Sequence, residues 1–313
     1  MHSNSEKISR RRFLNRAITT AAGVCGGLAV PSLARFELAP LRKPGSKMRF
    51  GLVTYLWAKD WDLPTLIRNC ETTNVLGVEL RSQHAHGVES NLTAQQRLEV
   101  KKRFKDSPVT CLGPGTNFAF HYADQAKLRE NIEGAKEYIK LSHDIGATGI
   151  KVKPNGLPKE VPAEKTIEQI GKSLNEIGKF AADYKQKIRV EAHGRETSDL
   201  PIMKKIFDIA DHPNVGVCWN SNDVDLKAPG LEHNFNLVKK RFADTVHVRE
   251  LNIGKYPYQQ LMNLFVKMDY KGWILLEART KPKDRVKALA EQRLVFETMI
   301  AKAQAALLSP VRL

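Results

Sequence analysis

The sequence predicts an α/β fold with a single domain, a (β/α)8 TIM barrel, and three observations support this. The chain has 313 residues, of which 42% are hydrophobic, so it is long enough to bury one large core. From Met48 onward, short runs of apolar and β-branched residues alternate with longer amphipathic segments. Eight such pairs lie between residues 48 and 308, a length that is typical of this barrel.

Each strand is expected where β-branched and apolar residues run together, and each helix where apolar residues recur with helical spacing. The expected strands cover residues 48–56, 75–81, 109–113, 147–153, 187–193, 215–220, 244–251 and 272–279. The expected helices cover residues 63–72, 94–105, 125–145, 163–184, 199–210, 232–242, 258–268 and 283–307. An open doubly wound sheet is the alternative fold. Such sheets usually carry a glycine-rich phosphate turn after the first strand, and the segment LVTYLWAKDW contains no glycine.

The N-terminus indicates export. The segment SRRRFLN is followed by a weakly apolar run rich in Ala, Gly and Thr, and then by a small-x-Ala cleavage site that ends at Ala34. This order is typical of a twin-arginine signal peptide, although an ordinary basic first helix is the alternative. We expect a signal peptide over residues 1–34, a spacer over 35–47, the barrel over 48–308 and a tail over 309–313. The protein would then be periplasmic or otherwise exported, without a stable membrane anchor after signal removal.

Charge and cysteine content exclude several classes of protein. Residues 1–47 hold nine Lys/Arg and two Asp/Glu, so the body keeps +9 of the net charge of +16. No compact Lys/Arg block stands out in this body, which argues against nucleic acid as a partner. The cysteines of the body, Cys70, Cys111 and Cys218, lie far apart in apolar stretches without CxxC spacing. We therefore expect buried thiols and neither a disulfide framework nor a structural zinc site.

Ionisable side chains gather at the C-terminal ends of the expected strands, where barrels of this kind place their function. The last strand, in GWILLEART, begins as a buried apolar run and ends in Glu277 and Arg279, which carry a desolvation cost unless they are paired. Glu191, Asn220 and His247 end the three preceding strands. Such a mixed oxygen and nitrogen set suits a divalent cation such as Mn, Co, Mg or Zn. Taken singly, a Glu at a strand end is more often ion-paired and a His in VHV is more often a core residue.

Four motifs carry a resemblance to a known family: RVEAHG, VGVCWNSND, TVHVRELN and GWILLEAR. From residue 48 to about 307 the chain resembles the xylose-isomerase-like TIM barrel superfamily of sugar isomerases and ketose 3-epimerases. In its epimerase-like members, strand five ends in Glu, strand six in Asp with a His three residues later, strand seven carries His, and strand eight closes with Glu. Glu191, His247 and Glu277 match this pattern, whereas Asn220 stands in place of the Asp and Asp223 in place of the His. An amide oxygen still coordinates but removes one negative charge, so weaker metal binding or another preferred ion is expected.

The resemblance implies an enzyme that removes a proton next to a carbonyl while a metal ion stabilises the enediolate. Glu191 and Glu277 would be both catalytic acid/base residues and metal ligands, with His247 and Asn220 as the other ligands. Two alternatives stay open. With a 3-keto glycoside, the same groups could remove the C2 proton and expel the C1 substituent, as a lyase does. The altered strand six also allows a barrel that binds a sugar without catalysis.

A further set of residues is expected to contact a small-molecule sugar or glycoside substrate. It consists of His193, Arg249, Arg279, Lys153, Trp57 and His86. Because alternate residues of a strand share a face, His193, Arg249 and Arg279 should point inward with the ligand two residues before each of them. Lys151 and Lys153 could instead pair with Glu79, and Trp57 could serve in core packing. Assembly into a homo-oligomer through helices beside the barrel is also open.

Overall fold

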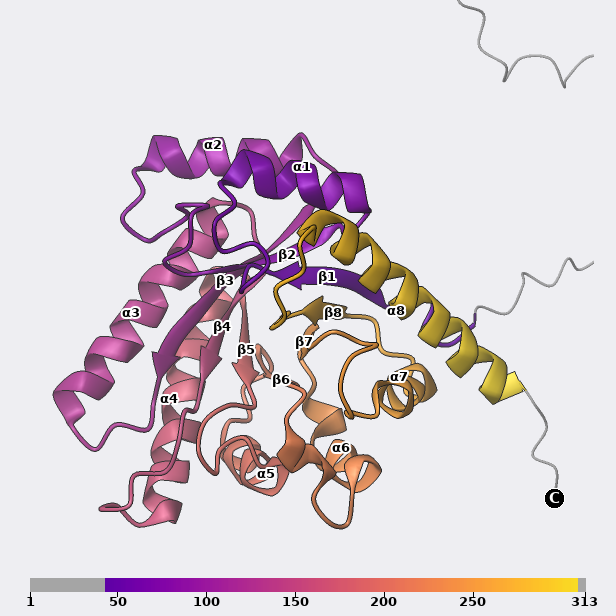
Figure 1. Cartoon of the computed structure of the whole chain (residues 1–313). Coiled ribbons are helices and arrows are strands. Elements are labelled where there is room, and N and C mark those ends of the chain that lie inside the picture. Colours follow the sequence, from indigo (N-terminus) through magenta and orange to yellow (C-terminus); the bar gives the residue numbers. More distant parts are fainter. Residues whose placement is uncertain (1–42, 309–313) are drawn as a thin grey trace, which may run out of the picture. The chain divides into compact units, whose positions relative to one another are not determined.

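The structure is a computed structural model that describes residues 43–308 (Figure 1). The expected signal peptide, most of the expected spacer and the expected tail lie outside these residues and stay predictions. No helix within the described part of the chain is both long and apolar enough to cross a membrane.

Eight parallel strands alternate with eight α-helices in the described chain, which confirms the predicted barrel (Figure 1). The strands are β1 Arg49–Val53, β2 Gly77–Arg81, β3 Thr110–Ala119, β4 Gly149–Lys153, β5 Lys187–Glu191, β6 Val215–Cys218, β7 Thr245–Val248 and β8 Trp273–Leu276. Their order in the sheet is β6-β5-β4-β3-β2-β1-β8-β7. Parallel bridges between Val217 and Phe242 and between Asn220 and His247 bring the two ends of this sheet together, so the barrel is nearly closed.

The helices lie close to their expected positions. They are α1 Leu63–Thr73, α2 Ala94–Lys105, α3 Gln125–Asp144, α4 Ala163–Asp183, α5 Leu200–Ile209, α6 Leu231–Val238, α7 Tyr258–Lys267 and α8 Arg285–Leu308. Side-chain caps set several starts: Asp62 accepts a hydrogen bond from the backbone N of Thr65 at the start of α1, and Thr93 forms a capping box with Gln96 at the start of α2. The expected helix 232–242 is interrupted, because α6 ends at Val238 and a 3₁₀ turn follows.

Strand β3 is longer than expected. The sequence predicts its end at residue 113, where Gly113, Pro114 and Gly115 suggest a turn, but the strand continues to Ala119. Gly113 has a φ of 126°, and a Cβ there would lie 1.8 Å from the backbone O of Gly149 on β4. The glycine therefore permits a close approach and an irregular register within the strand instead of ending it.

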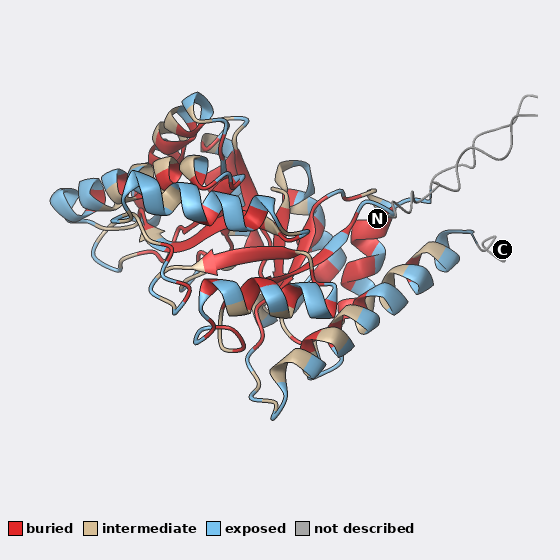
Figure 2. Cartoon of the chain, turned by 90° about the horizontal axis from the view of Figure 1, so that it is seen from above, coloured by how far each residue is buried: buried red, intermediate tan, exposed pale blue. Residues whose placement is uncertain are grey.

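The core has two parts, one outside and one inside the barrel. Outside, apolar residues of the strands pack against the buried faces of the helices (Figure 2). Inside, a small apolar cluster contains Val53, Leu112, Trp273 and Leu275. The interior positions nearer the C-terminal ends of the strands are polar, and these are the positions that form the candidate site.

The three cysteines that the structure describes, Cys70, Cys111 and Cys218, are free and buried, as predicted. Burial raises the pKa of Cys70 and of Cys111 to about 12, so both stay protonated thiols at neutral pH.

Candidate metal centre and active site

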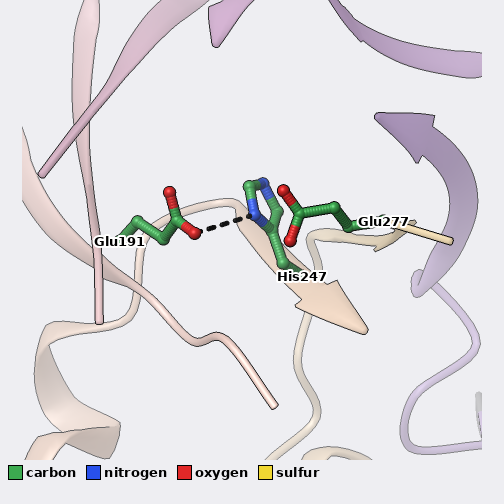
Figure 3. A group of neighbouring side chains, drawn as sticks. All are labelled: Glu191, His247 and Glu277. Atoms are coloured by element: carbon green, nitrogen blue, oxygen red, sulfur yellow. Dashed lines mark ion pairs between the residues drawn. The ribbon is translucent and has the colours of Figure 1, made fainter. Parts of the chain in front are cut away.

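Three of the four predicted ligands converge inside the barrel. Glu191 ends β5, His247 lies in β7 and Glu277 directly follows β8. Each offers one ligand atom, and these atoms all lie within 4.8 Å of one another. Figure 3 shows the imidazole of His247 between the two carboxylates. All three side chains are buried, so this is an enclosed O/N/O set that could hold a divalent ion.

The imidazole of His247 is fully buried and has a carboxylate on one side. Its Nε2 lies 3.2 Å from Oε2 of Glu79, while its Nδ1 has no hydrogen-bond partner among the described residues and lies 3.9 Å from Oε1 of Glu191. Burial lowers the pKa of His247, but the neighbouring Cys218 and Glu79 outweigh it and raise that pKa well above its usual value, so the imidazole is a cation in the absence of metal. A metal ion would replace the proton on Nδ1, while the carboxylate at Nε2 favours the proton on that nitrogen. The lone pair of Nδ1 then faces the two glutamates, and this unsatisfied buried atom fits a metal ligand.

The two glutamates have opposite electrostatic environments. Burial raises the pKa of Glu191, but the nearby Lys151 ammonium and His247 outweigh burial and hold the pKa of that carboxyl well below its usual range. Lys151 Nζ lies 2.8 Å from Oε2 of Glu191. Burial and then the charge of Glu191 raise the pKa of Glu277, whose nearest cation, Arg81, is 3.8 Å away. Carboxyl groups whose pKa values diverge in this way suit complementary acid and base roles.

Asn220 lies in the centre, whereas Asp223 does not. Asn220 is 3% exposed and its Nδ2 donates a hydrogen bond of 2.8 Å to Oε1 of Glu191. An amide reversed by 180° would present its oxygen to the same space, a change that a bound cation would favour. Asp223 is exposed in the 3₁₀ turn that follows β6. The role of Asn220 as a ligand stays a prediction.

Two of the predicted substrate contacts lie at the ends of neighbouring strands. Lys153 ends β4, and its Nζ donates to Oδ1 of Asn117 at 3.0 Å. His193 follows β5, and its Nδ1 lies 2.9 Å from Oδ1 of Asn155. Burial lowers the pKa of both Lys153 and His193. Both side chains have neutral amides as neighbours.

Trp57 and His86 have backbone partners. Trp57 is 3% exposed, and its Nε1 donates to the backbone O of Thr280 at 2.9 Å. His86 Nδ1 accepts from the backbone N of Val88 at 3.0 Å, so its Nε2 is the donor to the backbone O of Arg81 at 2.8 Å. These contacts tie the loops after β1 and β2 in place. Contact of either ring with substrate stays a prediction.

The two predicted arginines lie beyond the ends of their strands. Arg279 follows β8 by three residues and is exposed, so it lies beyond the strand whose alternation would turn it inward with Glu277. The alternation of a strand ends at Leu276, and the chain is irregular after it. Arg249 is half-buried, and its Nε has no hydrogen-bond partner among the described residues. Neither position tests whether the arginine binds substrate.

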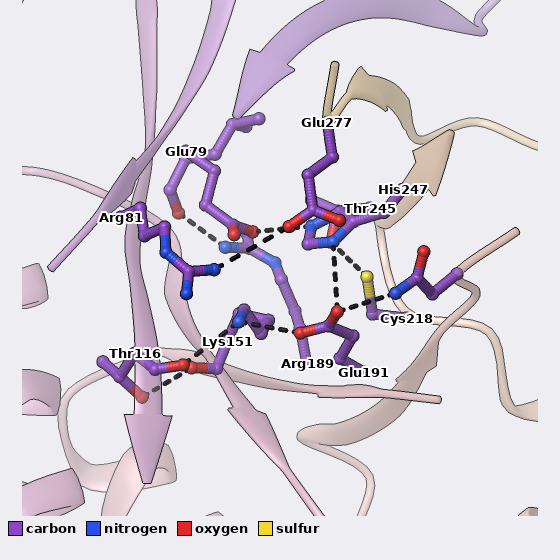
Figure 4. Close-up of polar contacts among 12 residues, drawn as sticks. Glu79, Arg81, Thr116, Lys151, Arg189, Glu191, Cys218, Thr245, His247 and Glu277 are labelled. Carbon is purple, nitrogen blue, oxygen red and sulfur yellow. Dashed lines mark hydrogen bonds and ion pairs between the residues drawn. The ribbon is translucent and has the colours of Figure 1, made fainter. Parts of the chain in front are cut away.

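Charged residues outside the predicted set surround the glutamates (Figure 4). Glu79 and Arg81 come from β2 and Lys151 from β4, and each contacts one of the three converging residues. A pairing of Lys151 or Lys153 with Glu79 is one of the alternatives that the sequence leaves open, and the structure pairs Lys151 with Glu191. A sequence signal did exist, because the segment VELR repeats the Glu-x-Arg pattern of LEAR at the end of another strand.

Comparison with known proteins supports the fold. A family model described as xylose isomerase-like TIM barrel matches residues 67–299. No curated protein matches the chain by sequence.

Solved structures with the same fold include L-ribulose 3-epimerase, with a TM-score of 0.72, 12% identity, and coverage of 85% of this chain and 99% of that chain. The apo form of 3-keto-D-glucoside 4-epimerase, YcjR, from E. coli has a TM-score of 0.67 and 13% identity, with 80% and 99% covered. The IOLI protein with a zinc atom has a TM-score of 0.69 and 13% identity, with 82% and 99% covered. At these identities the likeness shows the fold alone.

Proposed function

Because this chain belongs to the xylose isomerase-like TIM barrel family, we propose that it is a metal-dependent sugar isomerase or epimerase. One observation carries the proposal: Glu191, His247 and Glu277 bring their ligand atoms within 4.8 Å of one another in a buried site. The sugar epimerases among the solved structures of the same fold support the choice of substrate class.

The donor set decides what the site can hold. Glu191, His247 and Glu277 would be the ligands, with Asn220 as the fourth if its amide oxygen faces the ion. A bound divalent ion supplies Lewis acidity that polarises a substrate carbonyl and acidifies the neighbouring C–H. Mn, Co, Mg and Zn all accept such ligands, and the zinc in the IOLI structure is one example from the same fold.

The two glutamates would move the proton. Lys151 and His247 keep Glu191 ionised in the absence of metal, so its carboxylate is free to take a proton from carbon but is a weaker base than an ordinary glutamate. Burial and the charge of Glu191 raise the pKa of Glu277, so it is suited to hold a proton and to return it. The two carboxylates lie on opposite sides of the His247 imidazole (Figure 3), so they would approach a substrate carbon bound in this site from different directions. Removal by one glutamate and return by the other gives epimerisation.

A lyase acting on oxidised glycosides is the second candidate, supported by the 3-keto-D-glucoside 4-epimerase of the same fold. With a 3-keto glycoside, Glu191 would remove the C2 proton, and the electron pair would form the C1–C2 double bond as the C1–O bond breaks. Glu277 would protonate the departing oxygen. The two candidates therefore share their first step and differ in whether the C1 substituent leaves.

Proton exchange in D2O tests both candidates. We expect the full chain, loaded with Mn²⁺, to incorporate deuterium next to the carbonyl of ketoses, as followed by ¹H NMR. Glu191→Gln and Glu277→Gln should each slow this uptake by about 100- to 10,000-fold. Glu164→Gln, at a side chain that is 72% exposed, is the matched control. Uptake at the wild-type rate in both site variants would contradict the proposal. Release of a chromophoric aglycone from a 3-keto glycoside would identify the lyase.

Export through the twin-arginine pathway is part of the proposal. This pathway carries folded proteins, so the metal would be bound before transport. A location outside the cytoplasm favours free sugars or glycosides as substrates over phosphorylated intermediates. Fractionation of cells that express the full chain checks this location, and recovery of the mature protein in the cytoplasm would contradict it.

A further inference from the structure

Lys153 is a buried basic side chain without an acidic partner. It ends β4 and is 7% exposed. Its Nζ donates a hydrogen bond to Oδ1 of Asn117 at 3.0 Å, and this amide is neutral. Within residues 43–308, no carboxylate lies within the 4.0 Å ion-pair distance of Nζ. Buried charges are normally paired, so an unpaired ammonium at this place requires an explanation.

Lys151 lies two residues earlier on the same face of β4 and, unlike Lys153, is paired with a carboxylate. It is 1% exposed, and its Nζ lies 2.8 Å from Oε2 of Glu191. Glu191 and Glu277 also attract the charge of Lys153, but Glu191 is in direct contact with Lys151 and not with Lys153. Burial, followed by the charge of Lys151, lowers the pKa of Lys153 to about 8. The lysine therefore still carries its proton at neutral pH, although no carboxylate is in direct contact with it.

The loops around Lys153 are closely packed, which restricts any rearrangement that would bring a counter-charge to it. Asn155 has a φ of 69°, and Gly194 has a φ of 98°. A Cβ at Gly194 would lie 2.6 Å from Cα of Asn155, so the loops after β4 and β5 are in close contact. Nδ1 of His193 also binds Asn155. This packing leaves a bound ligand as the source of a counter-charge in direct contact with Lys153.

The net charge of the whole site also favours a negatively charged ligand. Around His247, which would be neutral as a metal ligand, the site contains as many acidic side chains as basic ones, namely Glu79, Glu191 and Glu277 together with Arg81, Lys151 and Lys153. A divalent ion bound by the glutamates would therefore leave the site with an excess of positive charge. A site with this excess favours a substrate that brings negative charge of its own.

We propose that the substrate is an acidic sugar, a keto sugar acid or uronate, whose carboxylate is bound by Lys153. This inference rests on the proposed function, because it assumes that the reacting carbon lies between Glu191 and Glu277. An ammonium with three donors can keep its bond to Asn117 and also donate to a carboxylate. Neutral ketoses offer only hydroxyl and carbonyl dipoles, which would leave the charge of Lys153 uncompensated.

Calorimetric titration of the full, Mn²⁺-loaded chain tests the subsite without turnover. The probes are D-glucuronate, D-galacturonate and D-mannuronate, each compared with its neutral hexose. We expect at least one acid to bind about tenfold more tightly than its neutral partner. In Lys153→Met this preference should disappear, and in Lys153→Arg most of it should remain. Lys172→Met, at an exposed lysine paired with Glu168, is the control. Thermal unfolding confirms that each variant is folded.

Each outcome decides between the two proposals. If no acid binds more tightly than its neutral partner, or if Lys153→Met keeps the preference, the anion subsite is wrong. Deuterium uptake from neutral ketoses would still support the proposed function in that case. A preference for acids that depends on Lys153, but without deuterium uptake from any sugar or sugar acid, would support the subsite and remove the isomerase proposal.

Discussion

At the scale of single residues, Glu79 is the contact that explains why His247 can serve as a ligand. Glu79 is fully buried, and its only hydrogen bond from another side chain within the described chain comes from His247. A Cβ at Gly115 would lie 2.5 Å from Oε1 of Glu79, so the glycine provides the space for this carboxylate. A buried carboxylate in this place orients the imidazole and increases its basicity. Glu79 is thus a positioning residue for the proposed metal centre.

Glu79→Gln should weaken metal binding by about 10- to 100-fold, because the amide keeps the volume of the side chain but removes its charge. Calorimetry with Mn²⁺ or Zn²⁺ measures the change. The ¹⁵N chemical shifts of His247 report on the tautomer, which a purely structural defect would not alter in a folded protein. Glu164→Gln, on the surface, should leave both quantities unchanged. Wild-type affinity and wild-type shifts in Glu79→Gln would remove Glu79 from this role.

Asn220→Asp tests the position at which this sequence differs from the epimerase-like pattern that its resemblance implies. Without metal, the new carboxylate would lie against Oε1 of Glu191, which Asn220 contacts at 2.8 Å, and like charges at that distance repel. We therefore expect the metal-free variant to unfold at a lower temperature than the wild type. With Mn²⁺ the added charge becomes a ligand, so affinity should equal or exceed that of the wild type. A large loss of metal affinity would show that Asn220 is not in the ligand set.

At the scale of strands and helices, the sequence predicts position well and pairing poorly. Glu191, His247 and Glu277 could be found because each is a polar residue at the end of an apolar strand, which is a local signal. The contact between Glu79 and His247 joins residues 168 positions apart in the chain. This contact depends on the arrangement of the strands around the nearly closed barrel. No local sequence pattern contains that information.

A local sequence rule misleads where the strand to which it applies ends earlier or later than expected. The alternation of β8 predicts a common face for Glu277 and Arg279, although the strand ends at Leu276 and the arginine is exposed. In β3, Gly113 marks the expected end of a strand that continues to Ala119. Glycine ends a strand in many folds, but here it lets two strands approach closely. Both errors concern backbone geometry, which depends on neighbours that are distant in sequence.

At the scale of the whole molecule, polar groups lie at two levels inside the barrel. Along β5, Arg189 and Glu191 share the interior face because they are two residues apart. Glu191 belongs to the candidate centre. Arg189 is fully buried below it and contacts Asp244 at 2.8 Å and the backbone O of Leu112 at 2.6 Å. The lower level joins β5 to the start of β7, so it supports the strands that carry the candidate ligands.

Asp244→Asn should therefore destabilise the entire fold, since it leaves the buried guanidinium of Arg189 without a counter-charge. We expect a loss of about 3 kcal/mol in the free energy of unfolding at pH 7, at the lower end for buried pairs because Asp244 is 23% exposed.

Arg189 and Lys187 hold the pKa of Asp244 below its usual range despite burial, which alone would raise it. A depressed folded-state pKa gives stability that is complete above the unfolded pKa of about 4 and is lost on acidification. Urea denaturation from pH 7 down to pH 2 should thus show the difference between wild type and variant narrowing below pH 4. Asp208→Asn, at an exposed residue paired with Lys204, should stay close to wild type throughout. A difference that is absent at pH 7, or that persists unchanged at pH 2, would show that this ion pair does not hold the barrel together.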